Sequence, residues 1–199
     1  MDEPESPAEF RDAVRQMRAA HLRPEILVEE MPAPQRIAPF SSALAADVTV
    51  DDEEVGGGRL VLLHDPAGND AWEGTFRCVA YARAEIDPEQ VTDPMLAGVG
   101  WSWLTEALEA HGARYLAPSG TVTCVASESF GGLSTEGATA QIEIRASWTP
   151  VGDVGSQNGA HFGVHFEAWG EVMCAAAGLP PVPDGVATLP SRRGQRGRG

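Results

Sequence analysis

The stretch from Leu60 to Ile86, LVLLHDPAGNDAWEGTFRCVAYARAEI, constrains the fold of this chain more than any other. Two apolar runs flank a short loop that contains Pro66, Gly68 and Asn69, which are common turn residues. The pattern predicts a β-hairpin with a polar tip. Because loops on a rigid scaffold often carry binding residues, this tip is a candidate functional site.

The rest of the chain shows separate strand-like and helix-like patterns. Residues 26–28 can form a short strand, and apolar and polar residues alternate in three further strand-like segments: 44–50, 122–126 and 142–148. Helical spacing of apolar residues predicts helices in three segments: 7–20, 101–111 and 166–176. These separate runs favour an α+β fold, with a mainly antiparallel sheet of about six strands and about three helices packed on one face.

Local signals suggest where some of these elements begin. Ser6 and Glu9 have the spacing of a capping box at the start of the first helix. Ser102 is a candidate cap for the second helix. The three glycines of 56–58 precede a strand, whereas a phosphate-binding loop places its glycines between a strand and a helix. They therefore predict a flexible turn.

The length of the chain, 199 residues, fits one domain. We expect this single α+β domain to span residues 7–182. Residues 1–6 are expected to be a disordered N-terminus, and residues 183–199 a disordered tail that is rich in Arg and Gly.

The formal net charge of −15 limits the possible partners. Four of the arginines lie in the tail, so the rest of the chain is more acidic still. An acidic body repels phosphate backbones and disfavours nucleic-acid binding, apart from weak contacts of the Arg-rich tail. A basic or neutral partner is easier to accommodate. The chain has no Lys, which excludes enzymes that depend on a lysine Schiff base or a phosphate-binding lysine.

The cysteines and histidines do not form a recognisable metal site. Cys78, Cys124 and Cys174 are widely spaced and lie in apolar runs, which indicates buried thiols rather than a disulfide framework or a zinc site. His161 and His165 are four residues apart, but two ligands do not make a metal site. We therefore expect no metal and no cofactor. A membrane span needs about 18 consecutive apolar residues, which this chain lacks, and it shows no signal peptide, so we expect a cytoplasmic protein.

Seven polar or aromatic residues near predicted turns and helix starts are candidates for binding: His64, Asp65, Asp70, Trp72, Trp101, Ser127 and Glu128. The imidazole and carboxylates of the hairpin tip have the chemistry for acid–base work if they converge in a cleft, and a solvated tip is the alternative. An exposed Trp72 suits a partner-binding patch, whereas burial against the sheet is the other interpretation. No spacing assigns a base to Ser127, so turn bonding is its default role.

Four long strings carry a resemblance to a known family: LLHDPAGNDAWEGTFRC at 62–78, GWSWLTEALEAHGAR at 100–114, PSGTVTCVASESFGGL at 118–133 and FEAWGEVMCAAAGLPPV at 166–182. With them the chain resembles the actinobacterial family called domain of unknown function 3000. The resemblance covers about Glu9 to Val182 and implies a cytoplasmic protein of an actinobacterium. It implies no activity, ligand or catalytic residue.

These observations favour a non-enzymatic, acidic interaction or accessory module. It would bind an unidentified protein partner through the hairpin tip and the neighbouring aromatic residues. The alternative is a small-molecule-binding protein or a hydrolase, with a pocket between the sheet and the predicted helix at 101–111. A third possibility is a homodimer formed through an exposed sheet edge or a tryptophan-bearing face.

Overall fold

The computed structural model describes residues 6–152 and 161–181. The predicted disordered tail and all but the last residue of the predicted N-terminal segment lie outside the described residues. The described helices are α1 (Ala8–Arg18), α2 (Leu96–Ala110) and α3 (Phe162–Ala176), with short 3-10 helices η1 (Gln90–Thr92) and η2 (Gly131–Glu136). The described strands are β1 (Ile26–Met31), β2 (Phe40–Val50), β3 (Glu53–Asn69), β4 (Gly74–Ile86), β5 (Tyr115–Glu128) and β6 (Ala138–Pro150).

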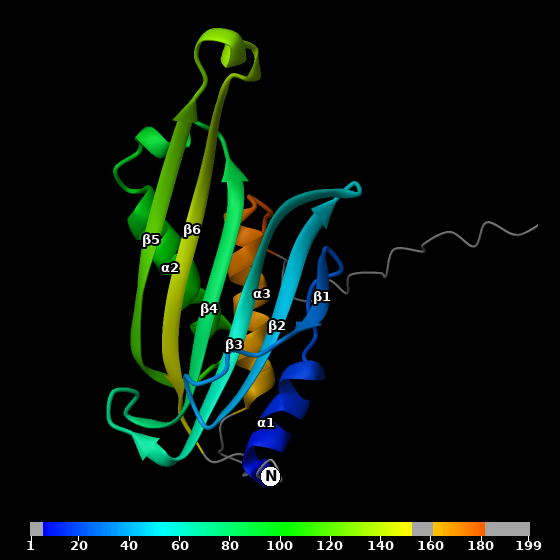
Figure 1. Ribbon diagram of the computed structural model, residues 1–199, viewed down its shortest axis with the longest axis vertical. Helices are drawn as coiled ribbons and strands as arrows, with labels where there is room; N and C mark the ends of the chain where they lie inside the picture. Colours follow the sequence, from blue (N-terminus) through cyan, green and yellow to red (C-terminus); the bar gives the residue numbers. More distant parts are fainter. Residues whose placement is uncertain (1–5, 153–160, 182–199) are drawn as a thin grey trace, which may run out of the picture.

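The six described strands form one open sheet in the order β1-β2-β3-β4-β6-β5, and all neighbours are antiparallel. All three α-helices lie on the same face of the sheet, behind it in Figure 1. The predicted α+β fold is therefore confirmed, as is the predicted hairpin, which is formed by β3 and β4. No helix of the described residues lies on the opposite face of the sheet (Figure 1).

The alternating sequence of the central strands explains why the helices cover only one face. Side chains two residues apart on a strand share a face. On β3, β4 and β6 one set of alternate residues is small or apolar and is buried under the helices: Leu60, Leu62, Cys78, Ala80, Ala82, Ile142, Ile144, Ala146 and Trp148. The other set includes arginines and hydroxyl residues. This second set forms the helix-free face.

The predicted turn at 56–58 is wrong, because these glycines lie inside β3. α3 packs closely against the sheet at this point. A Cβ atom on Gly58 would lie only 2.3 Å from the carbonyl oxygen of Tyr81 and 2.9 Å from Sδ of Met173. Gly58 is therefore needed for close packing of α3 against the sheet, which local sequence does not reveal.

Two predicted caps are also wrong. Pro7 occupies the N-cap position of α1, without a side-chain hydrogen bond. α2 begins earlier than predicted, at Leu96, because the Asp93 side chain accepts a hydrogen bond from the backbone N–H of Met95 and starts the turn that leads into the helix. Ser102 lies inside α2, where its hydroxyl donates to the Val99 carbonyl.

The three thiols are free in the structure. Cys78 and Cys174 are buried and Cys124 is partly buried. Burial raises the pKa of the Cys174 thiol to about 12, and it also raises the pKa of Cys78. None of the helices in the described residues has the length and apolar character needed to cross a membrane.

Candidate functional site

Two neighbouring rows of side chains cross the helix-free face of the sheet. Strand register aligns them, because directly paired residues of adjacent strands point to the same side. The first row is apolar at one end and hydroxyl-bearing at the other: Val61, Val79, Ser147 and Ser119. The second row carries two arginines and a tyrosine: Arg59, Tyr81, Arg145 and Thr121.

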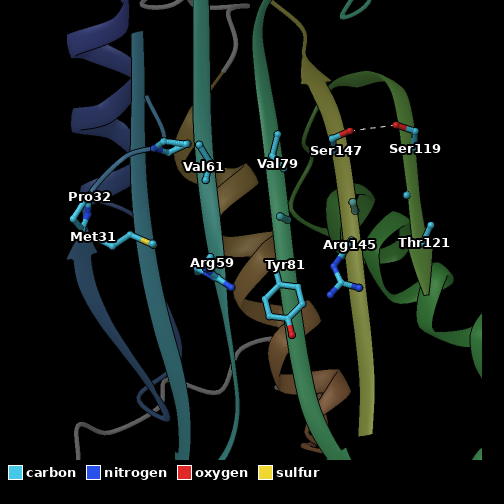
Figure 2. Close-up of a pocket in the computed structure, with 14 residues that line it drawn as sticks. Met31, Pro32, Arg59, Val61, Val79, Tyr81, Ser119, Thr121, Arg145 and Ser147 are labelled. Atoms are coloured by element: carbon cyan, nitrogen blue, oxygen red, sulfur yellow. Dashed lines mark hydrogen bonds between the residues drawn. The ribbon is translucent and has the colours of Figure 1, made fainter. Parts of the chain in front are cut away.

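These rows form the floor of a groove with a volume of about 590 Å³. Figure 2 shows both rows from the open side, with the helices behind the sheet. Met31 at the end of β1 and the following residues Pro32 and Pro34 line one end of the groove. The Ser41 hydroxyl donates to the Pro34 carbonyl at 2.9 Å, which holds this linker over the sheet.

Tyr81 lies between two guanidinium groups. The guanidinium carbon of Arg59 is 5.4 Å from the centre of the Tyr81 ring, and that of Arg145 is 5.2 Å from it. Both distances are within the range of cation–π contacts, which stack the planar groups against the ring. Burial, followed by the nearby Glu143 carboxylate, raises the pKa of Tyr81, so the ring remains a neutral phenol at physiological pH.

The two arginines differ in how their charge is balanced. Arg145 forms an ion pair with Glu143, with Nη2 and Oε2 2.6 Å apart. Arg59 forms no ion pair with any carboxylate of the described residues. Both side chains are exposed to solvent. The groove therefore presents a local positive charge within a chain whose net charge is −15.

Arg77 lies on β4 beside the first row, two residues from Val79, and is almost fully buried, with 7% of its surface exposed. Its guanidinium donates only to neutral oxygens: the Ala117 carbonyl (2.9 Å) and the hydroxyls of Thr149 (3.0 Å), Ser119 (3.1 Å) and Ser147 (2.7 Å). It forms no ion pair with a carboxylate in the part of the chain that the structure describes. Burial lowers the pKa of this group, and the Glu73 carboxylate, which acts on it without forming an ion pair, offsets this effect only in part.

His64, a residue predicted at the hairpin tip, lies inside the core. β3 continues to Asn69, and the His64 side chain is fully buried beneath α1. Its ring stacks on Phe76, with centroids 4.1 Å apart, and on Phe10 at 5.9 Å. Its Nε2 lies 3.0 Å from a carboxylate oxygen of Glu9, without the alignment of a hydrogen bond.

The other residues of the predicted tip make local turn contacts. The Asp65 carboxylate accepts a hydrogen bond from the backbone N–H of Ala67, and Asp70 is exposed. Trp72 is partly buried, and its carbonyl accepts a hydrogen bond from the Thr149 hydroxyl. The tip is thus held against β6 by its backbone.

The remaining predicted site residues lie elsewhere. Ser127 and Glu128 are exposed at the far end of β5, at the opposite end of the sheet from the β3–β4 tip (Figure 1). The Trp101 ring is packed against Gly120 on the helix side of the sheet. The structure therefore separates the seven predicted residues into four regions and brings none of them into the groove.

The sequence contained a signal for the groove that the predictions did not use. β3, β4 and β6 each carry an arginine among the alternate residues that face away from the apolar set. Four arginines on one face of adjacent strands (Arg59, Arg77, Arg83 and Arg145) are unusual in a chain with 14 arginines and 29 acidic residues. Strand register, which depends on contacts between distant segments, is what brings Arg59, Tyr81 and Arg145 into one row.

Comparison with known proteins gives a family without a function. The sequence model of a family described as protein of unknown function (DUF3000) matches residues 6–187. No curated protein and no solved structure matches the chain.

Proposed function

The chain belongs to the DUF3000 family, whose function is unknown, and on that premise we propose a function from the groove itself. We propose that the protein is a non-enzymatic cytoplasmic interaction module that holds an extended, acidic segment of a partner protein on the helix-free face of its sheet. This keeps the interaction role predicted from the sequence and moves it from the hairpin tip to the groove. It also replaces the basic or neutral partner that the net charge favours with an acidic one.

The observation that carries the proposal is the Arg59–Tyr81–Arg145 row. A cation that stacks on an aromatic ring keeps its N–H groups free at the edge, where they can bind a carboxylate. Arg59 has no acidic partner among the described residues, and Arg145 has only Glu143. The charge of the groove is thus opposite to that of the whole molecule and complementary to an acidic ligand.

The shape of the groove supports an extended peptide. Adjacent strands are about 4.8 Å apart, so a row across the four strands is roughly 15 Å long, which matches about four or five extended residues. Val61 and Val79 offer apolar contacts in the row beside the arginines. A segment that alternates acidic and apolar residues satisfies both rows at once.

The lining of the groove supports binding rather than catalysis. The described lining residues include no His, Asp, Glu or Cys. The serine and threonine hydroxyls of the groove therefore have no general base within this set, which a hydroxyl nucleophile requires.

Binding of a labelled peptide tests the proposal. The probe is a fluorescein-labelled peptide of alternating glutamate and valine, about five residues long, and the readout is fluorescence anisotropy. We expect saturable binding to the wild-type protein. The double variant Arg59→Ala, Arg145→Ala should bind about tenfold more weakly, because it removes two charge-assisted contacts.

Arg83→Ala is the matched control. Arg83 also lies on the helix-free side of β4, but it is paired with Glu54 and does not line the groove. We expect the affinity of this variant to equal that of the wild type. Equal losses in both variants, or binding of an all-lysine peptide as tight as that of the acidic one, would overturn the proposal.

A small organic anion is the second candidate ligand. The volume of about 590 Å³ lies within the usual range of small-molecule sites, roughly 300–1,000 Å³. The pocket that the sequence suggested for such a ligand, between the sheet and α2, is closely packed at Gly100, where a Cβ atom would lie 3.1 Å from Ile142 and from Val122. A benzoate that competes with the peptide at micromolar concentration would favour this candidate.

A further inference from the structure

The buried charge of Arg77 is not paired with an opposite charge of the described residues, as a buried arginine usually is. A buried charge is normally paired, because removing it from water costs several kcal/mol. The four N–H groups of its Nη1 and Nη2 atoms are all used, but every acceptor is neutral. A positive charge is therefore held close behind the wall of the groove. No carboxylate of the described residues forms an ion pair with it, and that of Glu73 offsets it only in part.

Two serines stand between this charge and the groove. Ser119 and Ser147 both line the groove, and each accepts a hydrogen bond from Nη2 of Arg77. Their Oγ atoms are 3.2 Å apart, so one hydroxyl can donate to the other (Figure 2). Each hydroxyl has a single proton. When one serine donates its proton to the other, the proton of the second serine has no acceptor among the described residues. Ser119 is exposed, so a ligand can reach this donor.

We propose that these two hydroxyls, polarised by Arg77, bind a carboxylate of the partner segment. We call Ser119, Ser147 and Arg77 the carboxylate seat. Arg77 supplies the charge, which acts strongly because the group is buried, and the serines supply the contact. This inference rests on the proposed function, since it assigns the position of one ligand group within the same groove.

The seat fixes how the segment lies. It is at the β5–β6 end of the first row, whereas the prolines of the β1–β2 linker line the other end. A carboxylate at the seat leaves the apolar part of the segment over Val79 and Val61, beside the second row. The carboxylate comes either from the C-terminus of the segment or from an acidic side chain, and both have the same chemistry at the seat.

The test compares peptides that differ in one carboxylate. The alternating glutamate–valine probe, labelled at its N-terminus, is prepared with a free C-terminus, with an amidated C-terminus, and with its last glutamate replaced by glutamine. We expect one of the two neutralised peptides to bind the wild-type protein about tenfold more weakly than the parent, because it loses a hydrogen bond to a charged carboxylate. The peptide that loses affinity identifies the source of the carboxylate.

Variants of the seat provide the second measurement. In Ser119→Ala, Ser147→Ala the tenfold difference between the parent and the neutralised peptide should disappear, while the weaker affinity for the neutralised peptide stays unchanged. Ser127→Ala is the matched control, because Ser127 faces Thr139 in the same β5–β6 ladder at the other end of the sheet. This variant should keep the full difference.

The results separate the two proposals. Equal affinities of all three peptides for the wild type would overturn the seat, and a tenfold difference that survives in the double serine variant would do the same. If the loss in Arg59→Ala, Arg145→Ala persists in either case, the groove proposal stands without the seat. If no acidic peptide binds the wild type, both proposals fail.

Discussion

The indole of Trp148 is completely buried, and its Nε1–H donates to Nδ1 of His165 at 3.0 Å. The neutral imidazole that accepts this bond must carry its proton on Nε2. That Nε2 is buried and has no hydrogen-bond partner among the described residues. Burial, followed by the nearby His161, lowers the pKa of His165 to about 4. His165 is thus a core residue that works as a hydrogen-bond acceptor for β6.

The lowered pKa predicts a specific acid sensitivity. The unfolded chain binds a proton at His165 with an ordinary pKa of about 6.5, whereas the folded protein binds it only near pH 4. Stability from this group is therefore complete above pH 6.5 and is lost as the pH falls toward 4, by roughly 3 kcal/mol in total. Urea unfolding measured from pH 7.5 to 4 should show this loss on top of the contribution of the carboxylates.

The variant His165→Gln isolates the effect. Its amide oxygen can still accept from Trp148, but the side chain does not titrate. We expect the difference in unfolding free energy between wild type and variant to shrink by about 3 kcal/mol between pH 7.5 and 4. If the two stability curves run parallel over this range, His165 is not the group responsible.

Single residues show what local sequence cannot predict about a candidate site. His64 follows an apolar run and precedes Asp65 and Pro66, so its local sequence is that of a loop. What buries it is Phe10, a residue of α1 that no local pattern connects with β3. A histidine with an aromatic neighbour from a distant helix cannot be told from a loop histidine without the fold.

At the level of elements, the contact between α3 and β3 depends on Gly58. A Cβ atom there would be 2.3 Å from the Tyr81 oxygen, 2.9 Å from Met173 and 3.2 Å from Nε1 of Trp169. The Trp169 indole also donates to the Tyr81 carbonyl at 3.1 Å. Backbone oxygen cannot move aside as a flexible side chain does. A methyl group added at Gly58 would therefore press against the backbone of β4 as well as against α3.

We expect Gly58→Ala to destabilise the protein by about 1–3 kcal/mol, the usual cost of overpacking. Gly98→Ala is the control: Gly98 lies in α2, and a Cβ atom there meets nothing within 4 Å. That substitution should stabilise the protein by up to about 1 kcal/mol, because alanine favours helix. Thermal unfolding measures both, and equal effects would contradict the proposed role of Gly58.

The elements themselves were largely predictable, and their alignment was not. Period-two alternation identified the strand around Ile144 and the two faces of β4, because alternation is a local property of the chain. The groove depends on which residue of β3 faces which residue of β4 and β6. This register is set by bulges and by helix packing, such as the bulge between Leu116 and Ser119 that places Ser119 opposite Ser147.

At the scale of the whole molecule, the order β4-β6-β5 places the last described strand between two earlier ones. β4 therefore pairs with β6, and α2 crosses behind the sheet to connect β4 with the edge strand β5 (Figure 1). This arrangement puts Arg145 next to Tyr81 and Ser119 at the end of the row. Sequence patterns predicted the class of fold but contain no direct information on this order.

The net charge of the molecule and the local charge of the groove have opposite signs. Which of them dominates the force on an acidic peptide depends on the distance between the peptide and the groove. At low salt the Debye length is about 30 Å, so an approaching acidic peptide is repelled by the net charge of −15. At 0.15 M it is about 8 Å, and only groups near the contact still act. Arg59 and Arg145 would contact the peptide directly. Salt weakens these short-range interactions more gradually than it weakens the long-range repulsion.

The association rate constant of the glutamate–valine peptide should therefore rise with salt, which is the reverse of a ligand steered by attraction. The dissociation rate constant should rise as well, because the contacts with Arg59 and Arg145 are partly screened. Stopped-flow anisotropy between 0.01 and 0.15 M salt measures both constants. A peptide with glutamine in place of every glutamate is the control, and its rates should depend little on salt. An association rate that falls with salt would mean that the field around the groove attracts anions at long range, so that the acidic surface does not govern their approach.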